Sequence, residues 1–354
     1  MSLSDGLLRW GILSTARIGR LNWNAMRDSG AATLVALASR DVGKAQAFVD
    51  ELQGESPWPE KPEALGSYEA LLEREDIDAV YVPLPTGIRK EWVMKAAAAG
   101  KHVLSEKPCA VSAEDLREII ECCEKHGVMY MDGVHFMHDE RFAKMKTMLG
   151  DGEAIGEVKR ISSAFTFRSD DDFTGTNIRG DTALEPTGCL GDLGWYCLRA
   201  SLWAMDWQMP VCISARVLDT VTQPDGTKVI MAFSGELEFP GGATADFYCS
   251  FLSPLQKWLR ISGTAGNLYV PDFVRPLAEF DIDWELNHIG EPRSKTRGMR
   301  SEAQMYRTFA EAVRGEVMDR KWAEYSLKTQ MVMDEVFRMV SGGRLGTAIP
   351  AGRG

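Results

Sequence analysis

The stretch LRWGILSTARIG, residues 8–19, decides the fold. Its first half is an apolar strand that ends at Leu13, and a helix is predicted from Ala16 to Arg27. Small residues in such a turn let the backbone approach a pyrophosphate, which the N–H groups at the helix N-terminus can bind. The residues predicted to bind a dinucleotide here are Gly11, Ser14, Thr15, Ala16, Arg17 and Ile18.

This turn departs from the usual glycine pattern, G-x-G-x-x-G. Gly11 holds the first position, but Ser14 and Ala16 stand where glycines are more common. An ordinary tight turn between a strand and a helix is therefore an equally good interpretation of these residues taken alone. The choice depends on the surrounding sequence.

Outward from this turn, short apolar runs alternate with amphipathic stretches as far as about residue 132. Alternation of this kind is typical of βαβ units and a parallel sheet. It predicts an α/β Rossmann domain over residues 1–132 that binds NAD(P). The further strands are predicted at 33–38, 77–82, 102–105 and 128–131, and the helices at 42–52, 67–73, 89–99 and 112–127, with Ser67 and Ser112 as N-caps.

Beyond residue 132 the pattern changes to strands separated by turn signals such as Pro224-Asp-Gly226. Strands joined by tight turns favour an antiparallel sheet. A second domain over residues 133–354 is therefore expected to bind the substrate and to mediate oligomerisation. Its strands are predicted at 158–167, 211–217, 229–239, 243–250, 258–262 and 267–270, its helices at 140–149, 191–205, 302–314 and 322–339, and a polar loop at 170–186.

The tip of the second strand indicates which dinucleotide is bound. Ser39 and Arg40 follow that strand, and Lys44 lies one helical turn further on. Sites for NAD usually place an acidic residue here, whereas sites for NADP place an arginine that binds the 2′-phosphate. These residues favour NADP. Asp41 leaves NAD open, and Lys44 also fits a solvated charge at a helix start.

Two further turns follow strands of the same sheet, and ligands bind at the carboxyl ends of such strands. Pro83, Leu84 and Thr86 are predicted to line the nicotinamide side of the site. Glu106 and Lys107 begin an EKP tripeptide after the next strand and are also predicted to bind the cofactor. A lysine there can polarise an oxygen and assist the proton transfer that accompanies hydride transfer. A surface Glu–Lys pair is the structural alternative.

Taken in order, these motifs resemble the Gfo/Idh/MocA family of oxidoreductases. The resemblance rests on residues 11–19, Ser39-Arg40, the EKP tripeptide at 106–108 and the sequence GDLGWY at 191–196. It runs through nearly the whole sequence. It implies an N-terminal Rossmann domain and a C-terminal α+β domain with an open, mainly antiparallel sheet.

The same resemblance implies roles for individual residues. Lys107 matches a catalytic lysine that also orients the cofactor. One branch of the family uses a histidine as acid/base after its D-x-G motif, and this sequence has none at the corresponding place. It is similar instead to the branch of glucose-fructose oxidoreductase, dimeric dihydrodiol dehydrogenase and NADP-dependent xylose dehydrogenase. In that branch a tyrosine is the acid/base, which matches Tyr196.

Two more residues complete the site that the resemblance implies. Asp192 lies one helical turn before Tyr196 and is given a catalytic and substrate-binding role with it. Arg179 lies in the sequence NIR at 177–179, which also resembles this branch, and is expected to bind substrate with Asp192 and Tyr196. One departure is Arg89, which stands where the family often carries a histidine after the third strand.

Composition narrows the partners and the location. The 354 residues carry a formal net charge of -11, which argues against nucleic acid or an anionic membrane as a partner. No apolar run approaches the ~20 residues that span a bilayer, and no secretory signal is present, so a cytoplasmic location is expected. Seven cysteines without a CxxC pair and five histidines without HExxH argue against a metal site. The resemblance also implies a homodimer or homotetramer, because the open sheet of the family commonly buries its outer face between subunits.

These observations predict an NADP-dependent dehydrogenase or reductase acting on CH–OH groups, with NAD as a possible cofactor. A sugar, polyol or dihydrodiol is the expected substrate, and Lys107 and Tyr196 are expected to handle the proton. Two alternatives remain open. One is a non-catalytic, dinucleotide-sensing regulatory protein on the same scaffold, and the other is an oxidation followed by elimination with recycled NAD.

Overall fold

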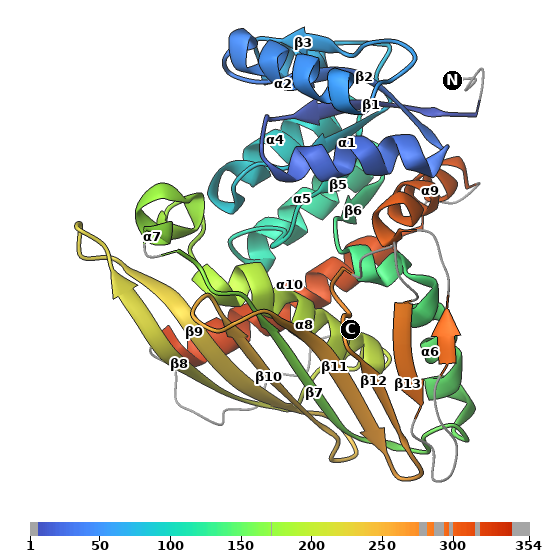
Figure 1. The fold of residues 1–354 in the computed structure, drawn as a ribbon, viewed down its shortest axis with the longest axis vertical. Coiled ribbons are helices and arrows are strands. Elements are labelled where there is room, and N and C mark those ends of the chain that lie inside the picture. Colours follow the sequence, from blue (N-terminus) through green and yellow to red (C-terminus); the bar gives the residue numbers. More distant parts are fainter. Residues whose placement is uncertain are drawn as a thin grey trace. The chain divides into compact units, whose positions relative to one another are not determined.

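The computed structural model describes residues 6–170, 172–275, 282–286, 294–296, 300–315 and 319–341. The protein divides into two compact units (Figure 1). The N-terminal unit comprises Met1–His138 and Met299–Ser326, and the C-terminal unit comprises Asp139–Gly298 and Leu327–Gly354. Within the described ranges, no helix is long and apolar enough to cross a membrane.

The N-terminal unit is built on a six-stranded sheet in the order β3-β2-β1-β4-β5-β6, with every pair parallel (Figure 1). β1 pairs with β2 on one side and with β4 on the other, so the strand order reverses there and leaves space for a ligand. This confirms the predicted Rossmann architecture. The strands are β1 (Leu8–Leu13), β2 (Ala32–Ala38), β3 (Glu63–Leu65), β4 (Ala79–Val82), β5 (His102–Ser105) and β6 (Tyr130–Asp132).

Helices join these strands, and both predicted N-caps are present. The Ser67 hydroxyl accepts a hydrogen bond from the N–H of Ala70, and the Ser112 hydroxyl accepts one from the N–H of Asp115. Two predicted helix starts are wrong: α1 begins at Ile18, and α4 begins at Thr86. The helices are α1 (Ile18–Ser29), α2 (Val42–Glu55), α3 (Tyr68–Leu72), α4 (Thr86–Ala98) and α5 (Ala113–Lys125).

A helix from far along the sequence completes the core of this unit. α9 (Ser301–Arg314) packs on β1, where the Trp10 ring lies 5.0 Å from that of Tyr306 and 4.9 Å from that of Phe309. The sequence division at residue 132 places this helix in the second domain, whereas the structure places it in the N-terminal unit. The amphipathic pattern of a helix does not tell which core its apolar face joins.

The C-terminal unit contains an eight-stranded sheet in the order β14-β13-β12-β11-β7-β10-β9-β8. β7 and β10 are parallel and the other neighbours are antiparallel, which confirms the expected open, mainly antiparallel sheet. The strands are β7 (Val158–Thr166), β8 (Cys212–Thr222), β9 (Lys228–Glu238), β10 (Thr244–Ser250), β11 (Gln256–Gly263), β12 (Asn267–Val270), β13 (Ile282–Leu286) and β14 (Ser294–Thr296).

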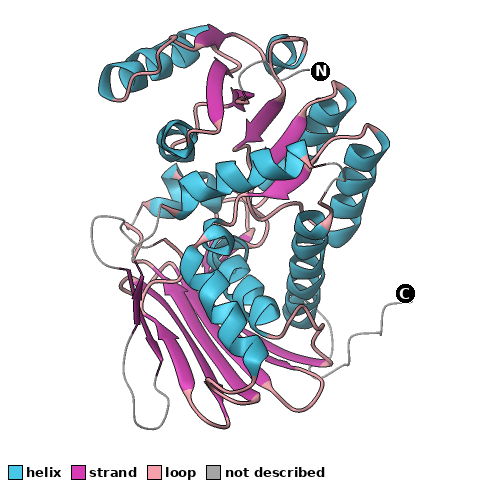
Figure 2. Cartoon of the chain, turned by 90° about the vertical axis from the view of Figure 1, so that its right-hand side faces the viewer, coloured by secondary structure: helices cyan, strands magenta, loops and turns pink. Residues whose placement is uncertain are grey.

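Helices cover one face of this sheet (Figure 2). α8 (Trp195–Ala204) packs on β7 and β10 and is buried along its whole length. The other helices are α6 (Glu140–Asp151) and the part of α10 (Lys321–Ser341) that begins at Leu327, because its first residues belong to the N-terminal unit. Two predictions are corrected. Residues 170–186 are more than a loop, because they form α7 (Phe173–Thr176) and a 3₁₀ turn, η2 (Ile178–Gly180). The helix predicted over 191–205 begins with a separate π-helical turn, η3 (Leu190–Gly194).

Candidate active site

The turn between β1 and α1 has the tight shape that its sequence predicts, but Gly11 has another role than the predicted one. Ser14 has a positive φ of 136°, and its hydroxyl accepts a hydrogen bond from the N–H of Ala16 at 3.0 Å. This bond holds Ala16 in the turn, so α1 starts later, at Ile18. Gly11 lies inside β1, and a Cβ there would stand 2.5 Å from Leu71. The missing side chain therefore makes room for α3.

A cavity of about 410 Å³ lies at the carboxyl ends of β1 and β2. Its lining joins residues from three separate turns of the sequence. Two of the lining residues, Arg40 and Lys44, are cations with exposed side chains. A concave site with two such cations suits an anionic ligand. The lining residues are Ser14, Thr15, Ser39, Arg40, Asp41, Lys44 and Tyr68.

Asp41 is the acidic residue that keeps NAD open as the cofactor, and the structure gives its carboxylate another task. Asp41 is the N-cap of α2, and its Oδ1 accepts hydrogen bonds from the N–H groups of Gly43 at 2.8 Å and Lys44 at 3.2 Å. Such a cap typically stabilises a helix by about 1 kcal/mol. The cavity is therefore lined by two cations and by one carboxylate that already accepts the hydrogen bonds of the helix start.

Tyr68 is a lining residue that the sequence reasoning missed. It is only 5% exposed, and its ring packs edge-on against that of Trp92 at 4.8 Å. Burial raises the pKa of the Tyr68 hydroxyl, and the neighbouring Arg40 and Ser14 offset part of this rise. β3 brings α3 to this place, because the N–H of Ser39 donates to the carbonyl of Leu65. β3 is three residues long, which is too short to give a strand signal.

The EKP turn follows β5 at the same edge of the sheet. Glu106 is 8% exposed, and Lys107 is half-buried. The Glu106 carboxylate accepts hydrogen bonds from the Tyr81 hydroxyl at 2.6 Å and from the N–H of Lys107 at 3.2 Å. The turn therefore begins with a carboxylate whose two oxygens each have a donor within the protein.

Arg89 explains the departure from the family pattern after β4. It is 2% exposed, and its guanidinium donates to the carbonyl oxygen of Leu84, with Nε at 2.9 Å, and to that of Pro108. Arg89 thus joins the turn after β4 to the EKP turn after β5. Pro83, Leu84 and Thr86 are all buried here, where they form the packed edge of the sheet.

The C-terminal unit brings two of the predicted substrate residues together. Arg179 forms a two-point ion pair with Asp192, with Nε–Oδ2 at 2.7 Å and Nη2–Oδ1 at 3.1 Å. The side-chain oxygen of Asn177 accepts from the backbone N–H of Arg179 at 3.1 Å, which fixes the turn that carries the arginine. Paired forks of this kind are stronger and more directional than single hydrogen bonds.

Asp192 and Tyr196 lie on consecutive turns, η3 and α8. The N–H of Trp195 donates to the carbonyl of Leu190, the i to i+5 bond of a π-turn. π-turns are rare and occur frequently at functional sites. Tyr196 is 7% exposed, and its ring packs edge-on against that of Phe165 at 5.4 Å. The aromatic body is thus fixed in the core.

Gly188 sets the start of this segment. Its φ is +52°, and a Cβ there would stand 2.5 Å from the carbonyl oxygen of Ile230. We expect Gly188→Ala to destabilise the protein by at least about 2 kcal/mol in chemical denaturation, because strain and a backbone clash act together. Gly226→Ala is the control, since Gly226 has φ +87° with open space around it. Equal losses in both variants would show that the approach to Ile230 is unimportant.

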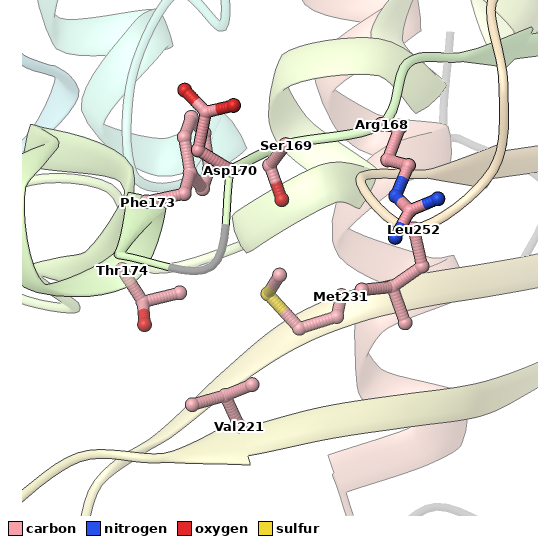
Figure 3. A pocket seen from close by; sticks show the side chains of 8 residues that line it. All are labelled: Arg168, Ser169, Asp170, Phe173, Thr174, Val221, Met231 and Leu252. Carbon is pink, nitrogen blue, oxygen red and sulfur yellow. The ribbon is translucent and has the colours of Figure 1, made fainter.

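A second cavity, of about 290 Å³, lies in the C-terminal unit beside α7 (Figure 3). Its lining combines charged groups with apolar side chains. Phe173 is held in its wall by the rings of Phe167 at 5.9 Å and Phe251 at 5.1 Å. Such a lining can meet both hydroxyl groups and apolar faces of one ligand. The residues are Arg168, Ser169, Asp170, Phe173, Thr174, Val221, Met231 and Leu252.

The parallel sheet and its cationic cavity define a dinucleotide-binding domain, and comparison with known proteins gives the family. Residues 8–134 match an oxidoreductase family with an NAD-binding Rossmann fold, and residues 142–269 match the GFO/IDH/MocA C-terminal domain. The chain therefore belongs to the Gfo/Idh/MocA family of oxidoreductases. This confirms the resemblance and the expectation of a nicotinamide-dependent enzyme.

Relatives extend over nearly the whole sequence. D-xylose 1-dehydrogenase (NADP(+)) 2 of Haloferax volcanii is 32% identical over 342 residues, which cover 95% of this chain and 98% of the relative. Trans-1,2-dihydrobenzene-1,2-diol dehydrogenase of Xenopus laevis is 29% identical and covers 84% of this chain and 88% of its own length. The solved structure of a 3-ketoreductase from Actinomadura kijaniata, in complex with NADP and TDP-benzene, has a TM-score of 0.81 at 25% identity, covering 94% and 97%.

Proposed function

We propose that this protein is an NADP-dependent dehydrogenase or reductase that transfers hydride between nicotinamide and a carbohydrate-like hydroxyl or carbonyl. The cavity at β1 and β2 is the observation that carries the proposal, because Arg40 and Lys44 line it while Asp41 caps α2. Relatives that act on D-xylose with NADP and on a dihydrodiol support the substrate class. The mixed lining of the second cavity also suits a carbohydrate.

The proposed cofactor contacts follow the edge of the sheet. Arg40, Lys44 and Ser39 hold the 2′-phosphate of NADP, with Tyr68 beside Arg40. The turn after β1, residues 14–17, and the N-terminus of α1 hold the pyrophosphate. Pro83, Leu84 and Thr86 line the nicotinamide side, next to the EKP turn. NAD is the weaker alternative, because its ribose needs a free carboxylate at the position of Asp41.

The proposed mechanism gives each residue one task. When bound, nicotinamide supplies the carbon that accepts or donates hydride. The Lys107 ammonium polarises the substrate oxygen and helps to hold its proton. The Tyr196 hydroxyl gives or takes that proton. Asp192, fixed by Arg179, binds a substrate hydroxyl near Tyr196.

Arg40 tests the cofactor assignment. In parallel fluorescence titrations, we expect wild-type protein to bind NADPH more tightly than NADH. Arg40→Ala should weaken NADPH binding by about 10- to 100-fold, the effect of removing a charge-assisted contact to phosphate, and leave NADH binding nearly unchanged. Arg117→Ala is the control, because Arg117 pairs with Glu114 at the surface of α5. Tighter binding of NADH by the wild type would overturn the preference for NADP.

A further inference from the structure

A line of hydrogen bonds runs through the core of the N-terminal unit and ends at Glu106. The Tyr306 hydroxyl donates to Oδ1 of Asn22 at 2.8 Å, and Nδ2 of Asn22 donates to the Tyr81 hydroxyl at 2.8 Å. The Tyr81 hydroxyl then donates to Oε1 of Glu106 at 2.6 Å. We call these four residues the Glu106 network. They come from α9, α1, β4 and the EKP turn.

The three hydrogen bonds that link the Glu106 network all run in one direction, from Tyr306 to the Glu106 carboxylate. Burial raises the pKa values of the Tyr81 and Tyr306 hydroxyls well above their usual range, and the nearby Glu106 charge adds to the rise in both. Both phenols therefore keep their protons and remain donors. Asn22 also donates to the carbonyl oxygen of Ile18 at 3.1 Å, which fixes the orientation of its amide. Asn22, Tyr81 and Tyr306 are fully buried.

The carboxylate at the end of the network has little room to move. A Cβ on Gly133 would stand only 3.1 Å from Oε1 of Glu106, so the turn after β6 closes against it. The other carboxylate oxygen accepts from the N–H of Lys107, and Arg89 binds the carbonyl of Pro108, the next residue. The backbone is thus held on both sides of the Lys107 side chain.

We propose that Tyr81 and Asn22 are positioning residues, which fix Glu106 so that it holds the backbone of Lys107 in its working position. Through Ile18, Asn22 also ties this arrangement to the first turn of α1, next to the loop that contacts the dinucleotide. The inference rests on the proposed function, because positioning matters for turnover only if Lys107 acts on the substrate. It assigns Glu106 to holding Lys107 and not to a contact with substrate.

Hydrogen exchange measures this positioning without any activity. In the full-length protein, the Lys107 amide should exchange about 10-fold faster in Tyr81→Phe than in the wild type, because the carboxylate loses a donor and releases the N–H. Glu106→Gln should have a similar effect, and the double variant should add little, since the two residues act in one network. Tyr130→Phe is the matched control, a buried tyrosine on β6 outside the network.

The exchange result has two readable outcomes. Faster exchange at Lys107 in Tyr81→Phe, with Tyr130→Phe unchanged, supports the positioning role. Unchanged exchange at Lys107 overturns it, whatever the protein catalyses. Thermal unfolding of each variant separates a local release from a general loss of stability, because a general loss would raise exchange throughout the sheet and not at Lys107 first.

Steady-state kinetics then connect the network to turnover. Tyr81→Phe should lower kcat by about 10- to 100-fold, the effect of a misplaced catalytic group, while KM for NADPH stays within about threefold. An unchanged kcat, or a rise in KM for NADPH that accounts for the whole loss, would contradict the inference. The failure of the proposed function looks different: Lys107→Met would then keep its activity, although the exchange at Lys107 still responded to Tyr81→Phe.

Discussion

Lys107→Met is expected to lower kcat by about 10³-fold or more, because one ammonium both polarises the substrate oxygen and shares its proton. Methionine keeps the length and the apolar stem of lysine, and Lys107 is half-buried at the end of β5, so the fold should survive. Turnover with NADP and circular dichroism measure the two effects. A titration with NADPH tells a loss of chemistry from a loss of binding.

Lys90→Met is the matched control for this variant. Lys90 lies on α4 and pairs with Asp115 and Glu118 at the surface, away from the EKP turn. Its loss should leave kcat within about twofold, since surface ion pairs contribute little. If Lys107→Met folded, bound NADPH and turned over substrate like the wild type, Lys107 would have no part in the chemistry.

Tyr196→Phe has the second largest expected effect, a fall in kcat of about 10²- to 10³-fold, the usual contribution of a positioned acid or base. Only the hydroxyl is removed, and the ring keeps its edge-on contact with Phe165. Thermal stability should therefore change little. NADPH binding should also be retained, because the described residues that line the cationic cavity belong to the N-terminal unit.

The control for Tyr196 lies on β10, one of the strands on which α8 packs. Tyr248 on β10 has its hydroxyl 2.9 Å from that of Ser253, so Tyr248→Phe removes an equivalent group outside the proposed site. It should retain nearly full activity. A Tyr196→Phe variant as active as Tyr248→Phe would exclude Tyr196 as the acid or base and would direct attention to another group near Asp192.

Structural features that depend on residues close together in the sequence could be predicted. The strand and small-residue turn at 8–19 and the serines before α3 and α5 gave the Rossmann elements, because periodicity and capping act within a few residues. The cavity residues Ser39, Arg40 and Lys44 were found in the same way, from their place after a strand. The roles of the EKP and GDLGWY motifs could be predicted only with the family resemblance. Taken alone, the EKP tripeptide is equally well explained by a Glu–Lys pair at the surface.

Features made by distant contacts could not be predicted. Tyr68 reaches the cavity because β3 pairs with β2, and Tyr306 enters the core because α9 packs on α1 and against the ring of Trp10. Arg89 is the first residue of a predicted helix, and no local signal indicates that its side chain is buried and bonded to the carbonyl oxygens of Leu84 and Pro108. The π-turn before Tyr196 is tightly packed at Gly194, where a Cβ would stand 2.9 Å from Leu190 and 3.3 Å from the sulfur of Cys249.

The most direct test is the reduction of NADP by the purified protein across a panel of aldoses, polyols and trans-dihydrodiols, with NAD in parallel. We predict that reduced nicotinamide accumulates with at least one of these alcohols, faster with NADP than with NAD. Tight binding of NADPH without turnover on any member of the panel would contradict an enzymatic role and would favour a dinucleotide sensor on the same scaffold.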